Sequence, residues 1–307
     1  MPYWQSDRPD EEVVANRDTA CDALVQLPEC RFKSPTPAWN RPGSERFLTL
    51  RGAENFLICP DCYLFAFANT IHENRFVPVH IRSGNEVISC DFGSSPWYRL
   101  AYLMALKRDI QDMRLLQGIA AVAVRAQACP GDQVAPRVWY SMLAPNARRP
   151  IQTFTICLSC ARMVEALLPD LEGYFIPLSS LDQPTRGICE LHFAPDRKRF
   201  FTYFRLMEDT TDRALARRAP PNIVQLADRI REISLPEECR RNTPLLNQKW
   251  HVLQKVPELT VCEECFEGFV LPMIEDEESR SEVPRNFYKQ RMLKPVAGEE
   301  REEGLRG

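Results

Sequence analysis

The chain has few of the residues that catalytic and nucleic-acid-binding sites use most. Only four histidines occur among its 307 residues, and 39 lysines and arginines are outweighed by 42 acidic residues, giving a formal net charge of −3. No global basic field therefore draws the protein to nucleic acid, which leaves that role to a local patch at most. The metalloprotease motif His-Glu-x-x-His, the P-loop and the serine-hydrolase motif Gly-x-Ser-x-Gly are also absent. These absences argue against three common classes of enzyme.

Targeting and membrane segments are missing as well. The stretch from Met1 to Asp7 has neither the basic nor the apolar region of a secretory signal. The apolar run from Ile119 to Val124 is much shorter than the ~18 residues of a membrane span. We therefore expect a cytoplasmic or nuclear protein that is not secreted and does not contact membranes. Because disulfides are rare in a reducing compartment, patterned cysteines there are more often metal ligands.

The cysteines, in contrast, form a sequence pattern that occurs three times along the chain. Three short apolar runs each end in a Cys-x-x-Cys pair, and these pairs are Cys59/Cys62, Cys157/Cys160 and Cys262/Cys265. A lone cysteine precedes each pair and is followed nine to eleven residues later by tryptophan, as in Cys30 and Trp39, Cys129 and Trp139, and Cys239 and Trp250. A fourth cysteine follows the first two pairs, at Cys90 and Cys189. Two complete sets of four result.

The matching spacings predict tetrahedral metal sites. Cys30 precedes Cys59 by 29 residues, and Cys129 precedes Cys157 by 28. In both sets the fourth cysteine lies 14 residues after the phenylalanine of a Phe-x-Pro segment, which is Phe76 or Phe175. Zinc fits this arrangement better than an iron–sulfur cluster, whose ligands lie in more compact runs. Disulfides, unliganded buried thiols and a redox role for the first Cys-x-x-Cys pair are the alternatives. We expect two or three structural zinc ions.

The third set is incomplete. Its three cysteines are Cys239, Cys262 and Cys265. If Pro284 is the counterpart of the earlier Phe-x-Pro prolines, the fourth ligand falls near Val296, which cannot bind metal. Cys21 or His251 could complete the site instead. Cys21 is slightly favoured because the twelve cysteines then divide into three sets of four, but the sequence does not separate the two.

These motifs predict an α+β protein of three tandem zinc-stabilised modules, each with a short strand, a Cys-x-x-Cys knuckle and amphipathic helices. We expect mobile ends at 1–18 and 297–307, with modules at 19–127, 128–234 and 235–296. A capping signal at Ser94-Ser95-Pro96 predicts one long helix, and its apolar stripe includes Leu100, Leu103, Met104, Ile110, Met113 and Leu116. A second helix is expected after Pro195-Asp196, and a third over 222–233.

The third module resembles a known group of proteins. Trp250-His251 is followed by Val256-Pro257-Glu258-Leu259-Thr260-Val261-Cys262-Glu263-Glu264-Cys265-Phe266 and then by Val270-Leu271-Pro272. This stretch is similar to a signature, Trp-His followed by Pro-Glu-x-Thr-Val-Cys-Glu-Glu-Cys, of uncharacterised cysteine-rich proteins of filamentous fungi of the ascomycete group. The similarity covers about 25 residues. It implies a fungal origin and a metal-bound structural core, and it carries no established activity.

The sequence as a whole favours a binding or scaffolding protein, not an enzyme, with another protein as its partner. One alternative is a nucleic-acid-binding protein that uses the basic and aromatic stretch from Arg197 to Arg205, together with the cluster from Arg213 to Arg218. We expect that stretch to form an amphipathic helix with its aromatic side chains in the core. The other alternative is a zinc enzyme at the third module, where an open coordination position could serve catalysis.

Overall fold

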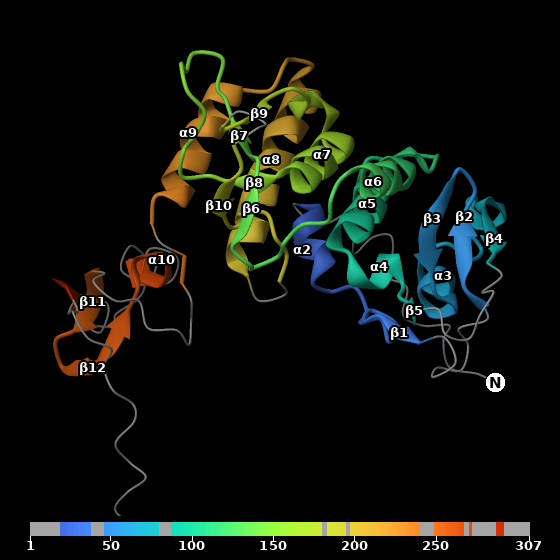
Figure 1. Cartoon of the computed structure of the whole chain (residues 1–307), viewed down its shortest axis with the longest axis horizontal. Coiled ribbons are helices and arrows are strands. Elements are labelled where there is room, and N and C mark those ends of the chain that lie inside the picture. Colours follow the sequence, from blue (N-terminus) through green and yellow to red (C-terminus); the bar gives the residue numbers. More distant parts are fainter. Residues whose placement is uncertain are drawn as a thin grey trace, which may run out of the picture. The chain divides into compact units, whose positions relative to one another are not determined.

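The computed structural model describes residues 19–37, 46–79, 87–179, 183–194, 197–236, 238–239, 249–266, 270–271 and 287–291. Helices and small antiparallel sheets alternate along the chain (Figure 1), and the cysteines gather in three groups that can hold metal ions. The predicted α+β fold class with three tandem modules is thereby confirmed. The chain divides into two compact units, Met1–Arg231 and Glu232–Gly307. The first two modules share the first unit, while the expected ends at 1–18 and 297–307 lie outside the described residues.

Each module contains a three-stranded antiparallel sheet whose first strand lies in the middle. The strand orders are β3-β2-β4, β8-β7-β9 and β12-β11-β13. The strands of the first unit are β2 (Leu48–Leu50), β3 (Ala53–Ile58), β4 (Phe76–Pro78), β7 (Trp139–Met142), β8 (Ile156–Cys157) and β9 (Phe175–Pro177). Those of the second are β11 (Lys249–Leu253), β12 (Val256–Val261) and β13 (Phe287–Arg291). In every module the second strand runs into the Cys-x-x-Cys pair, so the sheet fixes where that pair begins.

The strand registers correct one alignment made from the sequence. Leu50 pairs with Phe76 in the first sheet, and Met142 pairs with Phe175 in the second. The corresponding pair in the third sheet is Leu253 with Phe287. Phe287, and not a residue near Pro284, is therefore the counterpart of the earlier Phe-x-Pro phenylalanines. The sequence did not reveal this counterpart because Lys289 stands where the first two modules have the proline of Phe-x-Pro. The strand β13 still pairs with β11, since strand pairing uses backbone hydrogen bonds.

The tryptophan pattern is also corrected in the first module. The carbonyl of Trp139 accepts a hydrogen bond from the Leu178 N–H at 2.8 Å. In the first module the equivalent bond, from the Val79 N–H at 2.9 Å, goes to the carbonyl of Phe47. Phe47 therefore occupies the place of Trp139, and Trp39, which lies outside the described residues, is not its counterpart. Any large aromatic ring can fill this core position, so the spacing to tryptophan alone was misleading.

Two short two-stranded sheets bring distant cysteines toward one another. β1 (Thr36–Pro37) pairs with β5 (Val87–Ile88), and β6 (Ala135–Arg137) pairs with β10 (Thr185–Gly187). Each pairing joins the segment just after the first cysteine of a set to the segment just before the fourth. The first and fourth cysteines of each complete set are thus placed near each other by backbone hydrogen bonds.

The helices cover the sheets and form most of the core of the first unit. They are α2 (Ala20–Leu24), α3 (Pro60–Ala66), α4 (Asp91–Ser94), α5 (Pro96–Lys107), α6 (Arg114–Arg125), α7 (Leu158–Leu167), α8 (Lys198–Arg217) and α9 (Ile223–Ser234), with 3₁₀ turns at Glu73–Arg75 and Pro169–Leu171. The third module adds the short α10 (Glu263–Cys265). The helix expected over 222–233 is found within one residue at each end, and the one expected after Pro195-Asp196 is α8.

The long helix predicted after Cys90 is divided into α5 and α6. Asp109, between them, adopts a left-handed backbone with φ of 49°, which ends the first helix. The Asp112 carboxylate then accepts the Arg114 N–H at 3.0 Å and opens the second. The predicted apolar stripe is nevertheless largely buried, because both helices turn the same face to the core.

The first two modules pack against each other through aromatic and charged side chains. Trp97 on α5 lies edge-on to Phe200 and Phe204 on α8, with ring centroids 5.6 and 6.0 Å away. Lys107 at the end of α5 forms ion pairs with Glu208 and Asp212 of α8, at 2.9 and 2.6 Å. These contacts join residues about a hundred positions apart and make the two modules one unit.

Candidate metal centres

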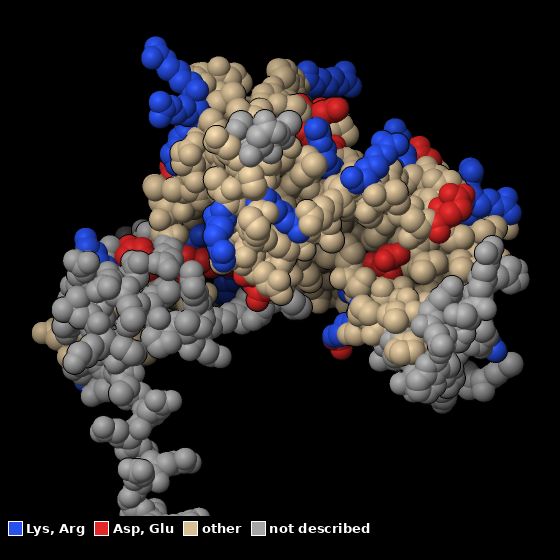
Figure 2. All heavy atoms as spheres, viewed as in Figure 1, with Lys and Arg blue, Asp and Glu red and all other residues tan. Residues whose placement is uncertain are grey.

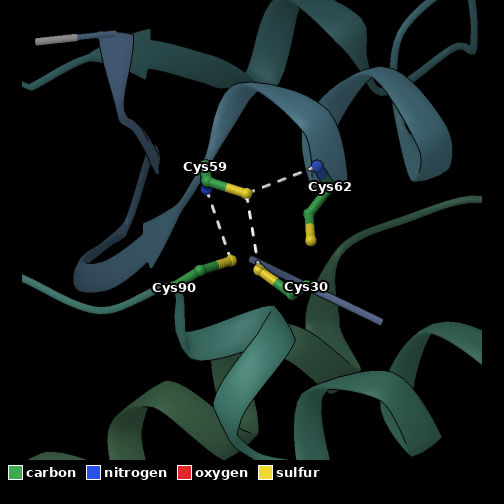
Figure 3. Close-up of side chains that lie close together, drawn as sticks. All are labelled: Cys30, Cys59, Cys62 and Cys90. Atoms are coloured by element: carbon green, nitrogen blue, oxygen red, sulfur yellow. Dashed lines mark hydrogen bonds between the residues drawn. The ribbon is translucent and has the colours of Figure 1, made fainter. Parts of the chain in front are cut away.

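The first complete set of cysteines forms one buried group. The side chains of Cys30, Cys59, Cys62 and Cys90 are all buried, and their sulfur atoms lie within 4.8 Å of one another. Figure 3 shows the four side chains converging, with Cys59 and Cys62 at the start of α3 and Cys90 just before α4. The sulfurs of Cys30 and Cys59 are 3.6 Å apart. Four thiols therefore face a single point in the protein interior.

Local backbone geometry explains why the Cys-x-x-Cys pair turns its sulfurs inward. Cys59 has an extended backbone and is the N-cap of α3, and Pro60 occupies the first helical turn, where its fixed φ is favourable. The Cys59 sulfur accepts the N–H of Cys62 at 3.5 Å. Cys157 caps α7 with the same backbone angles and the same 3.5 Å bond, from Cys160. A negatively charged sulfur is stabilised at such a helix N-terminus.

Further backbone groups donate to the sulfurs of the first site. The Cys59 N–H points to the sulfur of Cys90 at 3.3 Å, and the Phe32 N–H points to that of Cys30 at 3.3 Å. Hydrogen bonds from neighbouring thiols, that of Cys59 first, lower the pKa of Cys30, while those to Cys30 and then Cys59 raise the pKa of Cys62. The four thiols thus share protons among themselves, with the pKa of Cys30 lowered and that of Cys62 raised, and a bound cation would take the place of the shared protons.

The second complete set repeats this arrangement. Cys129, Cys157, Cys160 and Cys189 lie within 4.8 Å of one another, and all but the half-buried Cys129 are buried. The sulfurs of Cys157 and Cys189 are 3.8 Å apart, and the Cys157 N–H approaches the sulfur of Cys189 at 3.5 Å. Hydrogen bonds from its neighbours, Cys129 first, lower the pKa of Cys157, and burial raises that of Cys189.

The sulfur spacings fit a tetrahedral metal ion and not a disulfide. Four sulfurs at ~2.3 Å from one ion are separated from each other by about 3.8 Å, whereas bonded sulfurs lie ~2.05 Å apart. The observed separations of 3.6 and 3.8 Å match the first value. All twelve cysteines are described, and none forms a disulfide. The two complete sets therefore have the donor chemistry, geometry and burial of a tetrathiolate metal site.

The third group contains three cysteines. Cys239, Cys262 and Cys265 have their sulfurs within 4.8 Å of one another, with Cys262 buried and the other two half-buried. Cys262 again precedes a helical turn with an extended backbone, as Cys59 and Cys157 do. The Glu264 carboxylate accepts the Cys239 N–H at 2.5 Å and ties the distant cysteine to the knuckle. Burial, followed by hydrogen bonds with Cys262 and Cys239, raises the pKa of Cys265 to about 12.

Neither alternative fourth ligand belongs to a cysteine group among the described residues. His251 is buried on β11, where its Nε2 lies 3.1 Å from a Glu263 carboxylate oxygen. Its ring stacks on that of Phe266, with centroids 3.5 Å apart. Cys21 is buried in α2 of the first unit and is not part of the three groups. The choice between Cys21 and His251 stays a prediction.

The sequence alone did not single out Gly93, which supports the first site. A Cβ atom on this residue would lie 2.3 Å from the Cβ and 2.4 Å from the sulfur of Cys30. Only glycine therefore fits in the turn after Cys90. Asp91 was also missed: it accepts the Leu57 N–H at 2.7 Å, and burial raises its pKa to about 6 despite that bond. A glycine three residues after a predicted ligand was the available signal for the first of these.

Many side chains of the basic and aromatic stretch at the start of α8 are buried, as expected for an amphipathic helix. Phe200, Tyr203 and Phe204 are fully buried, and so, almost entirely, are Arg197 and Arg199. The guanidinium of Arg197 donates to the backbone carbonyls of Glu190 and His192 and pairs with the Glu190 carboxylate at 3.1 Å. Arg199 also approaches this carboxylate, at 3.8 Å. Two of the four basic side chains of the stretch are thus engaged inside the protein.

Comparison of the chain with family models, curated proteins and solved structures gives no significant match. Within the described part of the chain, none of the helices is both long enough and apolar enough to span a membrane. The functional argument therefore depends on the three cysteine groups themselves.

Proposed function

We propose that this protein is a non-catalytic binding or scaffolding protein of a reducing compartment, the cytoplasm or nucleus, whose modules are held together by zinc. The observation that carries the proposal is the pair of closed Cys₄ groups. A catalytic zinc keeps one coordination position for water or substrate, whereas a structural zinc has all four positions filled by protein. Four converging and mostly buried thiols per site leave no such position in the first two modules.

Zinc is favoured over other cations by the donor set. Thiolate sulfur is a soft ligand, and tetrahedral four-sulfur sites are typical of zinc and of iron–sulfur proteins. The N–H groups of Cys62 and Cys160 point at ligand sulfurs in the manner of outer-shell contacts that hold metal ligands in place. Structural zinc contributes ~10–16 kcal/mol per site at neutral pH, as much as the whole stability of an ordinary domain. Metal binding would therefore decide whether each module folds.

A protein partner is supported over nucleic acid by the location of the basic side chains. Arg197 and Arg199 are engaged with Glu190 and are not offered to a phosphate backbone. On the face drawn in Figure 2, the described Lys and Arg residues are interspersed with acidic and uncharged ones and form no single field. Nucleic-acid binding depends on such a field and weakens steeply with salt. A labelled RNA or DNA that shifts at low salt, and loses the shift in Lys198→Ala/Arg205→Ala, would favour the alternative.

Metal exchange tests the structural role directly. A strong chelator at neutral pH should abolish the near-ultraviolet circular dichroism of the full chain, because Trp139 is buried next to the second site. Added Zn²⁺ should restore the signal, and so should Cd²⁺, a soft cation that also accepts four thiolates. Protein that keeps its signal and its melting temperature after losing its zinc would refute the proposal. Hydrolytic activity that appears with Zn²⁺ and not with Cd²⁺ would favour an enzyme.

A further inference from the structure

The third metal centre has fewer strong ligands than the other two. In residues 232–307 the only cysteines and histidines are Cys239, His251, Cys262 and Cys265. Three of the four form the group, and the fourth, His251, is not part of it. The second unit therefore offers three thiols and no further cysteine of its own.

The strand register, together with the sequence spacing of the first two modules, indicates which position corresponds to their fourth cysteine. In the first two modules this residue lies 14 positions after the phenylalanine that pairs with the end of the central strand, Phe76 or Phe175. Phe287 holds that place in the third sheet. Fourteen positions further is Arg301, a cation that cannot bind a metal ion. The module thus keeps three thiols of the repeated arrangement and lacks the one that Cys90 and Cys189 provide.

His251 is engaged in other contacts. Its Nε2 is within hydrogen-bond distance of Glu263, and its ring lies flat on Phe266 with an interplanar angle of 7°. Its backbone pairs with that of Val261, directly before Cys262. Leu48 and Tyr140 hold the same register position in the first two sheets, and neither is a metal ligand there. The position of His251 is accordingly a packing position of the fold.

The thiols of the third group are also more accessible. Cys239 and Cys265 are half-buried, whereas the four cysteines of the first group are all buried. A metal ion held by one buried and two half-buried thiolates can be reached from solvent by a further ligand. Among the described carboxylates next to the group, Glu263 faces His251 and Glu264 accepts the Cys239 N–H.

We infer that the third site binds zinc through Cys239, Cys262 and Cys265 and that its fourth ligand is a thiolate from outside the chain. This inference rests on the proposed zinc-binding function and names the partner chemistry of one of its sites. An incoming thiol gives its proton to solvent, and its sulfur displaces the water that otherwise completes the coordination. A thiolate is the expected class because it restores the four-sulfur set that the same fold builds twice in the first unit. The source is either a small cellular thiol or a cysteine side chain of a partner protein.

The inference predicts that the third zinc is held more loosely than the other two. Competition with a chromophoric chelator should remove one zinc per chain at an affinity at least about tenfold lower than the remaining two, since even changes in outer-shell contacts cost 10–100-fold. Three ions that leave together at high affinity would overturn the inference and leave the proposed function intact. Fewer than two tightly held ions would instead refute the proposed function.

Cobalt(II) placed in the emptied third site reports its ligands. In full-length protein reduced with a phosphine, added glutathione should raise the sulfur-to-cobalt charge-transfer absorption by roughly one third, as the cobalt–sulfur bonds rise from three to four. S-methylglutathione, which has no thiol, should leave the absorption unchanged. A short peptide with a single cysteine, compared with its serine version, separates the two sources: saturation by the peptide at lower concentration than glutathione indicates a partner's cysteine, and the reverse order a small thiol.

Three variants test the ligand assignment. Cys262→Ser should lose the cobalt absorption, because two thiols do not hold the ion in this way. Cys21→Ser and His251→Ala should both keep the absorption and its response to glutathione. The inference would be overturned if the cobalt absorption did not change with either glutathione or the cysteine peptide. It would also be overturned if the absorption of Cys21→Ser or His251→Ala were lower before any thiol is added, because that would show an internal fourth ligand.

Discussion

At the residue scale, Cys59 and Cys157 have two roles at once. Each belongs to a Cys₄ group, and each caps the helix that follows it through a bond from the second cysteine of its pair. Cys59→Ser and Cys157→Ser should therefore each lose one zinc and destabilise the protein by about 4 kcal/mol or more, the range of mutations that remove a metal. Zinc analysis combined with urea unfolding measures both effects.

Cys21→Ser is the matched control for these substitutions. Cys21 is as buried as Cys157 but belongs to no cysteine group among the described residues. The control should keep the two zinc ions of the complete Cys₄ groups. If Cys59→Ser and Cys157→Ser matched the control in zinc content and melting temperature, the groups would not be metal sites.

Gly93 gives a second test at the same scale. Alanine at this position would place a methyl group 2.3 Å from the Cβ of Cys30, inside the first metal group. We expect Gly93→Ala to cost about 1–3 kcal/mol, as overpacking of a buried site does, and to weaken zinc binding at that site. Gly118→Ala on α6 is the control, since its nearest neighbour would be 3.6 Å away. Alanine should stabilise that helix by up to about 1 kcal/mol. Equal stabilities of the two variants would contradict this account of Gly93.

At the scale of elements, Glu208 connects three helices. Its carboxylate is fully buried on α8, accepts the Ala20 N–H at the start of α2 at 2.8 Å, and pairs with Lys107 of α5 at 2.9 Å. Glu208→Ala should cost about 3–5 kcal/mol, because it removes one partner of a buried ion pair. Asp228→Ala, which breaks an exposed pair with Arg231, should cost no more than about 1 kcal/mol. Urea unfolding of both variants that gave equal costs would contradict the role assigned to Glu208.

The pH dependence of this connection has a definite sign. Burial lowers the pKa of Lys107, but hydrogen bonds with Asp212 and Glu208 raise it by more, so that it lies above its ordinary value. A cation whose pKa is raised in the folded state contributes stability at neutral pH that is lost as the pH rises through that pKa. The cost of Glu208→Ala should consequently shrink in strongly alkaline solution.

The sequence predicted the elements around the cysteines better than those between them. A strand before each Cys-x-x-Cys pair and a helix after it follow from local signals, β-branched residues and an N-cap, which act within a few residues. The break between α5 and α6 depends on one left-handed residue, Asp109, inside a continuous apolar pattern. The periodicity of apolar residues along the sequence does not reveal such a break in the helix. Phe287 was missed for a related reason, since strand pairing uses the backbone and tolerates the loss of a motif residue.

At the scale of the whole molecule, the division into two units was not readable from the cysteine repeat. Contacts such as that of Trp97 with Phe200 join the first two modules across about a hundred residues of sequence, and a local sequence pattern does not predict such contacts. The repeat treats three modules as equivalent, whereas the chain forms one unit from two of them. Burial of large side chains on helices from both modules, and not the metal sites, decides this grouping.

Truncation tests the larger unit. A fragment ending after Ser234, the last residue of α9, contains both complete Cys₄ groups and all helices that pack around them in the first unit. It should be soluble, hold two zinc ions and unfold in one cooperative transition, because its two modules share one core. Two separate transitions, or a fragment that holds only one zinc, would contradict the shared core.

The central claim, that thiolate-bound metal stabilises the fold of each module, is tested most directly by the metal content of the reduced full-length protein. Elemental analysis should find at least two zinc ions per chain, and X-ray absorption at the zinc edge should show mainly sulfur ligands at about 2.3 Å. Folded protein that carries less than one zinc per chain, with no other thiolate-bound metal in its place, would contradict the account.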